Sequence, residues 1–178
     1  EMEANVLNIL DKHFFGYGST RIQDIVFEQL AFKNESMSLI EIHTDGEVLD
    51  SLAHEMTNQE AFKGGLYFTR NVDAVKYFSI EEVNGNKKEQ NEKFARKALE
   101  KFQSDYGIAV TGWGKNKLSY NRMPEIVLIS IAKADGKVFT KELDLTERSY
   151  FARWLLALKV SDTIRRFLLD LPQLDERY

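Results

Sequence analysis

Residues 37–52 read MSLIEIHTDGEVLDSL, and this stretch indicates the class of fold. Met37 to Ile42 alternate in the manner of a β-strand, residues 44–46 form a turn, and apolar residues recur at helical spacing from Val48 onward. Thr44 or Asp45 is expected to cap the start of that helix, as short polar side chains commonly do. The stretch therefore predicts a strand followed directly by a helix, the repeating unit of α/β folds.

Further strands and helices are predicted on both sides of this unit. In chain order they are a helix at 21–32, a strand at 66–69 behind Gly64-Gly65, a helix at 71–78, a polar loop at 84–91, a helix ending near 102, strands at 106–111 and 126–132, a hairpin turn at 134–137 into a strand at 138–140, and a helix at 148–171. The strands 106–111 and 126–132 are apolar on both faces, so both are expected inside one mixed sheet. The predicted architecture is a three-layer α/β/α sandwich around that sheet.

The final helix is expected to cover one face of the sheet, with Leu155 and Leu158 buried. Trp154 and Leu156 would then form a second apolar side of the same helix. Exposed apolar patches usually mark interfaces, so this side is a candidate subunit contact.

The composition restricts the class of protein and of partner. With 178 residues, 43% of them hydrophobic, the chain is expected to form one packed domain. A formal charge of -4 gives little attraction for phosphates, so nucleic acid is not expected as a partner. The absence of cysteine fits a reducing compartment, and no apolar run approaches the ~20 residues that span a bilayer. We therefore expect a cytoplasmic protein that has no membrane segment.

The three histidines, His13, His43 and His54, do not indicate a metal site. None of them forms the H-x-x-x-H pair that places two imidazoles on one helical face. We expect neither a metal nor a cofactor.

Four blocks of the sequence resemble the C-terminal domain of the CinA family, whose stand-alone relatives are nicotinamide mononucleotide deamidases. Residues 40–46, IEIHTDG, are similar to the family's A-E-S-C-T-G-G, and residues 65–74, GLYFTRNVDA, follow without a gap where the family has G-x-x-x-Y-S-N-E-A-K. Residues 105–112, DYGIAVTG, read almost as the family's third block, and residues 145–148 are similar to the G-D-R before its final helix. The resemblance covers nearly the whole chain and implies the same α/β/α fold.

The resemblance also predicts the organisation of the chain. Residues 21–178 correspond to the CinA C-terminal domain. Residues 1–20 form an entry segment that resembles the junction between this domain and the upstream molybdopterin-binding-like domain of full-length CinA proteins. The family's dimers imply a homodimer, formed through the final helix or the strand near residues 64–69.

The residues that carry the family's chemistry are replaced in this chain. Its serine nucleophile, tyrosine and lysine correspond here to Ile42, Thr69 and Ala74. Isoleucine offers no nucleophile and alanine no base, so the amidase mechanism cannot operate as the family uses it. The glycine-rich loop after the third block is also replaced, by residues 113–116, and Trp113 is expected to crowd any phosphate there.

The same correspondence predicts a candidate cleft for a small nucleotide ligand. Its expected lining is His43, Thr44, Gly46, Thr69, Asn71, Thr111, Gly112 and Arg148. Lys115 and Arg122, together with Arg148, are the basic residues that could hold an anion there.

Three hypotheses for the function remain open at this point. The first is a CinA-like domain that is not a working amidase and that acts in binding, regulation or assembly. The second is a hydrolase with altered chemistry in the same cleft, around His43 and Thr69, although His43 equally fits an ordinary strand-to-helix turn. The third is a purely structural dimerisation module.

Overall fold

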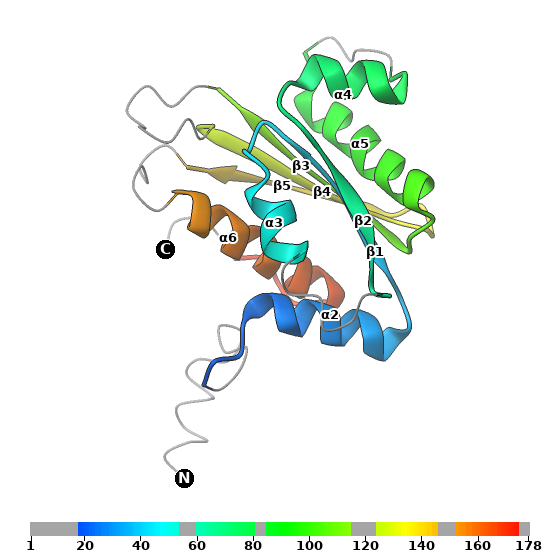
Figure 1. The fold of residues 1–178 in the computed structure, drawn as a ribbon, viewed down its shortest axis with the longest axis vertical. Coiled ribbons are helices and arrows are strands. Elements are labelled where there is room, and N and C mark those ends of the chain that lie inside the picture. The colour runs from blue at the N-terminus through cyan, green and yellow to red at the C-terminus, as the bar shows by residue number, and fades with distance from the viewer. Residues whose placement is uncertain (1–17, 54–59, 81–84, 115–123, 146–151, 175–178) are drawn as a thin grey trace.

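The computed structural model describes residues 18–53, 60–80, 85–114, 124–145 and 152–174 (Figure 1). Their helices and strands, in chain order, are α2 (Ile22–Lys33), β1 (Met37–Ile42), α3 (Glu47–Ala53), β2 (Phe62–Phe68), α4 (Asn71–Phe78), α5 (Lys87–Phe102), β3 (Tyr106–Trp113), β4 (Ile126–Lys133), β5 (Val138–Asp144) and α6 (Ala152–Leu168).

The five described strands form one mixed sheet in the order β2-β1-β3-β4-β5. The first three strands in this order are parallel, whereas β4 and β5 run antiparallel to their neighbours. Strands β3 and β4 are therefore both interior, as their apolar sequences predicted.

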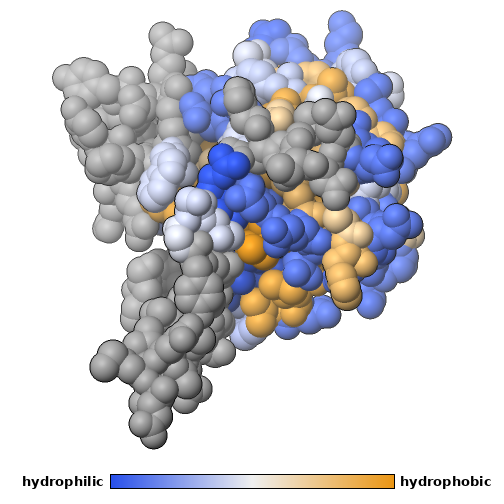
Figure 2. Space-filling model, turned by 60° about the horizontal axis from the view of Figure 1, so that its bottom comes forward, coloured by the Kyte–Doolittle hydropathy of each residue, from blue (hydrophilic) through white to orange (hydrophobic). Residues whose placement is uncertain are grey.

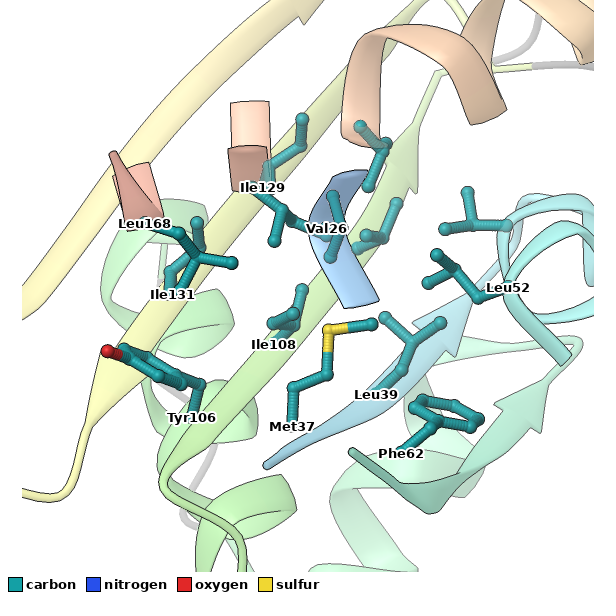
Figure 3. Packing of buried hydrophobic residues seen from close by; sticks show 14 of the residues in the cluster. Val26, Met37, Leu39, Leu52, Phe62, Tyr106, Ile108, Ile129, Ile131 and Leu168 are labelled. Atoms are coloured by element: carbon teal, nitrogen blue, oxygen red, sulfur yellow. The ribbon is translucent and has the colours of Figure 1, made fainter. Parts of the chain in front are cut away.

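Helices cover both faces of the sheet, which confirms the three-layer α/β/α architecture. On one face, α2, α3 and α6 pack against Leu39, Ile108 and Ile129 of three neighbouring strands (Figure 3). On the other face, α4 and α5 cover a smaller apolar cluster that includes Ile40 and Ala109. Figure 1 shows the two groups of helices on opposite sides of the strands.

The approach of α5 to the sheet depends on Gly107 in β3. A Cβ atom at this position would lie 2.0 Å from the Ala95 carbonyl oxygen and 2.5 Å from the Leu99 amide nitrogen. Both are backbone atoms of α5, so no side-chain rotation can make room. Glycine at this position therefore fixes how closely α5 lies on β3.

Several element boundaries differ from the sequence-based prediction. The polar stretch 84–91 was predicted as a loop, but α5 already begins at Lys87 because Asn86 caps it: the Asn86 side chain accepts a hydrogen bond from the Glu89 amide at 3.1 Å. Strand β2 begins at Phe62, before the two glycines rather than after them. Strands β3 and β5 extend to Trp113 and Asp144, because each additional residue finds a partner on β4.

The prediction for the buried side of α6 was wrong. Leu155 and Leu158 are half-buried, whereas Leu156 is fully buried together with Val160 and Ile164. Leu156 therefore faces the sheet and does not share a second apolar side with Trp154, which is 66% exposed. The apolar residues of this helix are dense enough that several rotations about its axis fit the sequence, and only packing selects one. The segment 148–151, predicted as its first turn, lies outside the described residues.

None of the helices in the described segments is both long and apolar enough to cross a bilayer.

We predict that Gly107→Ala destabilises the protein strongly. Overpacking of a core typically costs about 1–3 kcal/mol, and a contact with immovable backbone belongs at the upper end of that range. Gly136→Ala is the matched control: it adds the same methyl at a turn where nothing lies within 4 Å, so it carries only the strain of a φ of +93°. Urea unfolding monitored by circular dichroism compares the two variants. Equal stability of Gly107→Ala and the native chain would contradict the close packing of α5 on β3.

Candidate functional site

The candidate cleft lies at the carboxyl edge of the three parallel strands. The connection from β1 runs through α3 to β2, whereas β3 leads on to β4 on the opposite side of β1. Neighbouring strands whose connections leave in opposite directions create a crevice at their carboxyl ends, where α/β proteins commonly bind ligands. His43 directly follows β1, and Gly112 is the second-last residue of β3.

The positions aligned with the family's serine and lysine meet in this region and are both apolar. Ile42 ends β1, Ala74 lies on α4, and both are completely buried in one hydrophobic cluster. Phe94 of α5 belongs to the same cluster and is also completely buried. The two positions therefore belong to one cluster that consists of apolar side chains.

The start of α3 is held by Glu41 of β1. Its carboxylate accepts hydrogen bonds from the Thr44 hydroxyl at 2.6 Å, the Val48 amide at 3.3 Å and the Leu49 amide at 2.7 Å. Thr44 is therefore a donor to Glu41. Helix α3 begins at Glu47, so Gly46, and neither Thr44 nor Asp45 as the sequence predicted, is the residue directly before it. A carboxylate at this place satisfies amides that have no partner within the helix and also complements its positive end.

Glu41 is fully buried, and this burial changes its acidity. Removal from water raises the pKa of the Glu41 carboxyl above its usual value, and the hydrogen bonds from Thr44, Leu49 and Val48 offset this rise only in part.

His43 closes the crevice between β1 and β3. Its backbone has a φ of +58°, its amide donates to the Phe68 carbonyl at 2.9 Å, and its ring Nδ1 lies 3.3 Å from the Gly112 carbonyl oxygen. Because a carbonyl oxygen only accepts, this contact requires the hydrogen on Nδ1 and leaves Nε2 as the acceptor of the neutral ring. Any Cβ at Gly112 would lie 2.6 Å from the His43 carbonyl oxygen and 2.4 Å from Pro124. The chain itself therefore occupies the mouth of the crevice.

Thr111 is committed to a buried polar network. Its hydroxyl donates to Asn91 Oδ1 at 2.6 Å, while Asn91 Nδ2 donates to the Ala109 carbonyl oxygen and to the Ser130 hydroxyl. Ser130 lies 2.9 Å from the Thr140 hydroxyl, which in turn donates to Glu92 at 3.0 Å. The Thr140 hydroxyl has one hydrogen and donates it to Glu92. The Ser130 hydroxyl must therefore be the donor in its hydrogen bond with Thr140. The network joins α5 to β3, β4 and β5, and Thr111 has no free hydroxyl to offer a ligand.

The remaining residues of the predicted cleft do not share a hydrogen-bond network with His43 or Thr111 in the part of the chain that the structure describes. Asn71 begins α4 and donates to Gln90 at 3.3 Å, and its buried Oδ1 has no hydrogen-bond partner among the residues that the structure describes. Thr69 is exposed beyond the end of β2, and Gly46 takes the positive φ of +79° that the β1–α3 turn requires. Arg148, Lys115 and Arg122 lie outside the described residues. Within the described part of the chain, no cluster of three or more His, Asp or Glu residues could hold a metal.

Known proteins that are similar to this chain in sequence or in structure are competence/damage-inducible proteins or CinA superfamily proteins. A putative competence-damage inducible protein of Clostridium botulinum (strain ATCC 19397 / Type A) is 24% identical over 173 residues, which are 94% of this chain. The solved structure of competence/damage inducible protein CihA from Agrobacterium tumefaciens matches 88% of this chain and 98% of its own with a TM-score of 0.67 at 15% identity. A CinA superfamily protein from Klebsiella pneumoniae matches 85% and 99% with a TM-score of 0.69 at 12% identity. The chain is thus similar in sequence and in fold to proteins of the CinA family.

The extent of these matches limits what they imply. The chain spans only 42% of the length of the curated relative, although it covers nearly the whole of the solved structures. The structural likeness at 12–15% identity supports the α/β fold of this chain. No family model matches it.

Two residues of the site were missed from the sequence. Glu41 interrupts an otherwise buried strand, and an acidic side chain on a core-facing position is a signal that it has a buried partner. Asn91 lay in the stretch assigned to a loop, although Asn86 followed three residues later by Glu89 is the pattern of a helix start. Extending the helix by one turn would have placed Asn91 on the buried side with Phe94 and Ala98.

We predict that Glu41→Ala lowers the free energy of unfolding by about 2 kcal/mol or more. The variant leaves the Val48 and Leu49 amides without their acceptor, and each buried unsatisfied donor costs roughly 1–3 kcal/mol. Glu100→Ala removes an exposed carboxylate that pairs only with Lys97, so it should cost no more than about 0.5 kcal/mol. Chemical denaturation of both variants is the measurement. Similar stability of Glu41→Ala and Glu100→Ala would show that Glu41 does not hold α3.

The raised pKa of Glu41 also predicts how stability depends on pH. The carboxyl titrates near 4.5 in the unfolded chain and binds its proton more tightly in the folded chain. Its contribution to stability is therefore fully present below the unfolded pKa and is lost as the pH rises through the folded pKa. The stability of the native chain relative to Glu41→Gln, which does not titrate, should therefore fall as the pH rises above the unfolded pKa of 4.5. Unfolding curves at several pH values test this, and a relative stability that rises with pH would refute it.

Proposed function

We propose that this chain is a CinA-family domain that does not hydrolyse the amide of nicotinamide mononucleotide and that acts in binding, regulation or assembly. The observation that carries the proposal is the environment of Ile42 and Ala74. Both aligned catalytic positions are completely buried in an apolar cluster.

The chemistry of the family requires groups that this cluster does not contain. A serine attacks an amide only when a neighbouring base takes its proton. Neither Ile42 nor Ala74 carries an oxygen or nitrogen in its side chain, and Phe94 of the same cluster excludes water from their neighbourhood. Thr69, aligned with the family's tyrosine, is exposed rather than directed into this cluster.

The family residues that the chain retains have structural roles in this fold. Glu41 and Thr44 hold the start of α3, Thr111 anchors Asn91, and Gly112 allows the backbone of β1 and β3 to approach closely. None of these roles requires a substrate. Retention of packing residues together with loss of reactive ones supports a domain that keeps the fold for another use.

The alternative function is a hydrolase with altered chemistry around His43 and Thr69. His43 Nε2 remains an acceptor and could serve as a base, because Nδ1 faces the Gly112 carbonyl oxygen. This alternative needs a nucleophile, and no hydrogen bond between His43 and a hydroxyl group is observed within the described residues. It is therefore the second candidate.

We predict that ammonia release from nicotinamide mononucleotide stays at background with the native chain. In a serine hydrolase, loss of the nucleophile alone lowers turnover by roughly a millionfold, and further losses add little because the groups act as a unit. Ile42→Ser alone should therefore remain inactive, whereas Ile42→Ser with Ala74→Lys and Thr69→Tyr is the smallest variant expected to recover a trace of activity. A coupled ammonia assay with thermal melts of every variant separates lost chemistry from lost fold.

The opposite result has a defined meaning. Robust deamidase activity of the native chain that is abolished by His43→Ala or Thr69→Ala would replace the present proposal with the altered hydrolase. Activity of the native chain that is unaffected by both substitutions would contradict the proposed loss of deamidase activity and would also exclude His43 and Thr69 as its source.

We also propose that the chain assembles as a homodimer, as the family resemblance implies. The described residues expose four large hydrophobic side chains: Phe32, Val72, Tyr77 and Trp154. Figure 2 shows hydrophobic patches interrupted by hydrophilic residues on the face that it presents. Exposed apolar patches of this kind are typical of subunit contacts.

We predict a mass near twice 20.6 kDa in light scattering. Trp154→Ser should shift the equilibrium toward the monomer if α6 forms the contact, because it removes the large exposed aromatic side chain of that helix. Tyr77→Ser on α4 is the matched control for a contact elsewhere. A mass of one chain at high protein concentration would contradict the proposal.

A further inference from the structure

A hollow of about 300 Å³ lies on the α4/α5 side of the sheet, between the first turn of α5 and the surface of β4 and β5. Its lining, which defines what we call the α5 hollow, consists of Lys87, Lys88, Trp113, Ile126, Leu128, Thr140 and Glu142. The hollow is separate from the apolar cluster around Ile42 and Ala74, since the two share no residue.

The register of the sheet explains why these side chains meet. Trp113 pairs with Ile126 across β3 and β4, and Leu128 pairs with Glu142 across β4 and β5. Directly opposite residues on antiparallel strands point to the same face of a sheet. Thr140 closes the inner end of the hollow, where the buried polar network holds its hydroxyl between Ser130 and Glu92.

The floor and one wall of the α5 hollow are apolar. Leu128 is only 5% exposed, and Ile126 and Trp113 are half-buried. The Trp113 indole nitrogen is itself buried, so the part of the ring that remains accessible is its carbon surface. These side chains offer a ligand contact with hydrocarbon and an aromatic ring.

The rim of the hollow is positively charged. The Lys87 ammonium lies 5.2 Å from the centre of the Trp113 ring, and Lys88 is the next residue of the same helical turn. Neither lysine forms an ion pair with a side chain of the described residues. The lining contains these two lysines and one acidic residue, Glu142, so its own formal charge is positive, whereas that of the whole chain is -4. The Glu92 carboxylate lies behind the lining, where it accepts a hydrogen bond from Thr140 at 3.0 Å.

We propose that the α5 hollow binds a small organic anion that has one carboxylate or phosphate head on an apolar ring. The head would be held by Lys87 and Lys88, and the ring would lie on Ile126, Leu128 and the carbon surface of Trp113. Ligand pockets of this kind combine a mostly apolar lining with a few polar groups that fix orientation, and about 300 Å³ is at the small end of their range. This inference does not depend on the absence of amidase activity.

The experiment uses Trp113 as its reporter. The chain has two tryptophans, and Trp154→Phe removes the other one at an exposed position, so the fluorescence of this variant arises from Trp113 alone. Benzoate and phenyl phosphate are the anionic probes, and benzamide is the neutral analogue of benzoate. Isothermal titration calorimetry with the native chain provides a second measurement that does not depend on fluorescence.

We expect saturable binding of at least one of the two anions and at least tenfold weaker binding of benzamide. Lys87→Gln combined with Lys88→Gln should weaken the binding of the anion about tenfold, and added salt should weaken it further because the contacts are charged. Lys97→Gln, on a later turn of α5 and paired with Glu100, should leave the affinity unchanged. The ratio of benzoate to phenyl phosphate affinity identifies the preferred head group.

Three outcomes would overturn the proposal. They are equal affinity for benzamide and benzoate, unchanged affinity of the double lysine variant, and absence of saturable binding by both methods. Loss of binding in Lys97→Gln as well would likewise place the anion outside the α5 hollow. Because all the substituted lysines are at the surface of the helix, thermal melts of the variants should match those of the native chain and exclude unfolding as the cause.

Discussion

A buried carboxylate on the strand β1 sets the geometry of the whole carboxyl edge. Glu41 accepts two amides of the first turn of α3 and the hydroxyl of Thr44, so it fixes where the helix begins relative to the strand. The turn between them must then be tight, with positive φ angles at His43, Asp45 and Gly46. That tight turn presses the His43 carbonyl against Gly112 of β3 and closes the crevice at the point where an α/β sheet ordinarily binds its ligand.

The residues around the crevice divide into those that shape the backbone and those that fill space with hydrocarbon. Glu41, Thr44 and Gly112 take part in contacts between main-chain segments, where a substitution disturbs the path of the chain itself. Ile42 and Ala74, by contrast, pack with Phe94 in one apolar cluster. A cluster without polar atoms leaves no buried group that needs a partner, so these positions add no such cost to the fold.

On the face of the sheet that α5 covers, a buried polar network takes the place of an apolar contact. Asn91 binds Thr111, Ala109 and Ser130, and this polar network ties the first turns of α5 to three strands. The helix covers β5 incompletely, and Trp113 stands at the edge of the uncovered area with Lys87 above its ring. The proposed anion site would lie in the α5 hollow, on a part of the sheet away from the closed crevice between β1 and β3.

The sequence by itself determined the order of strands and helices and the two interior strands, because apolar periodicity is a local property of the chain. The blocks at 40–46, 65–74 and 105–112 carry its resemblance to the CinA family. The sequence did not determine the start of α5, because Asn91 is polar and reads as part of a loop in the sequence. Its burial is explained only by its hydrogen bonds to β3 and β4, which exist in the folded sheet. The sequence also misassigned the buried side of α6, where apolar residues occur around most of the helix and only contact with the sheet selects Leu156 over Leu155 and Leu158. The cap formed by Glu41 and the closure formed by His43 and Gly112 were likewise decided by tertiary structure, because burial and hydrogen bonding between separate segments exist only once the sheet has brought them together.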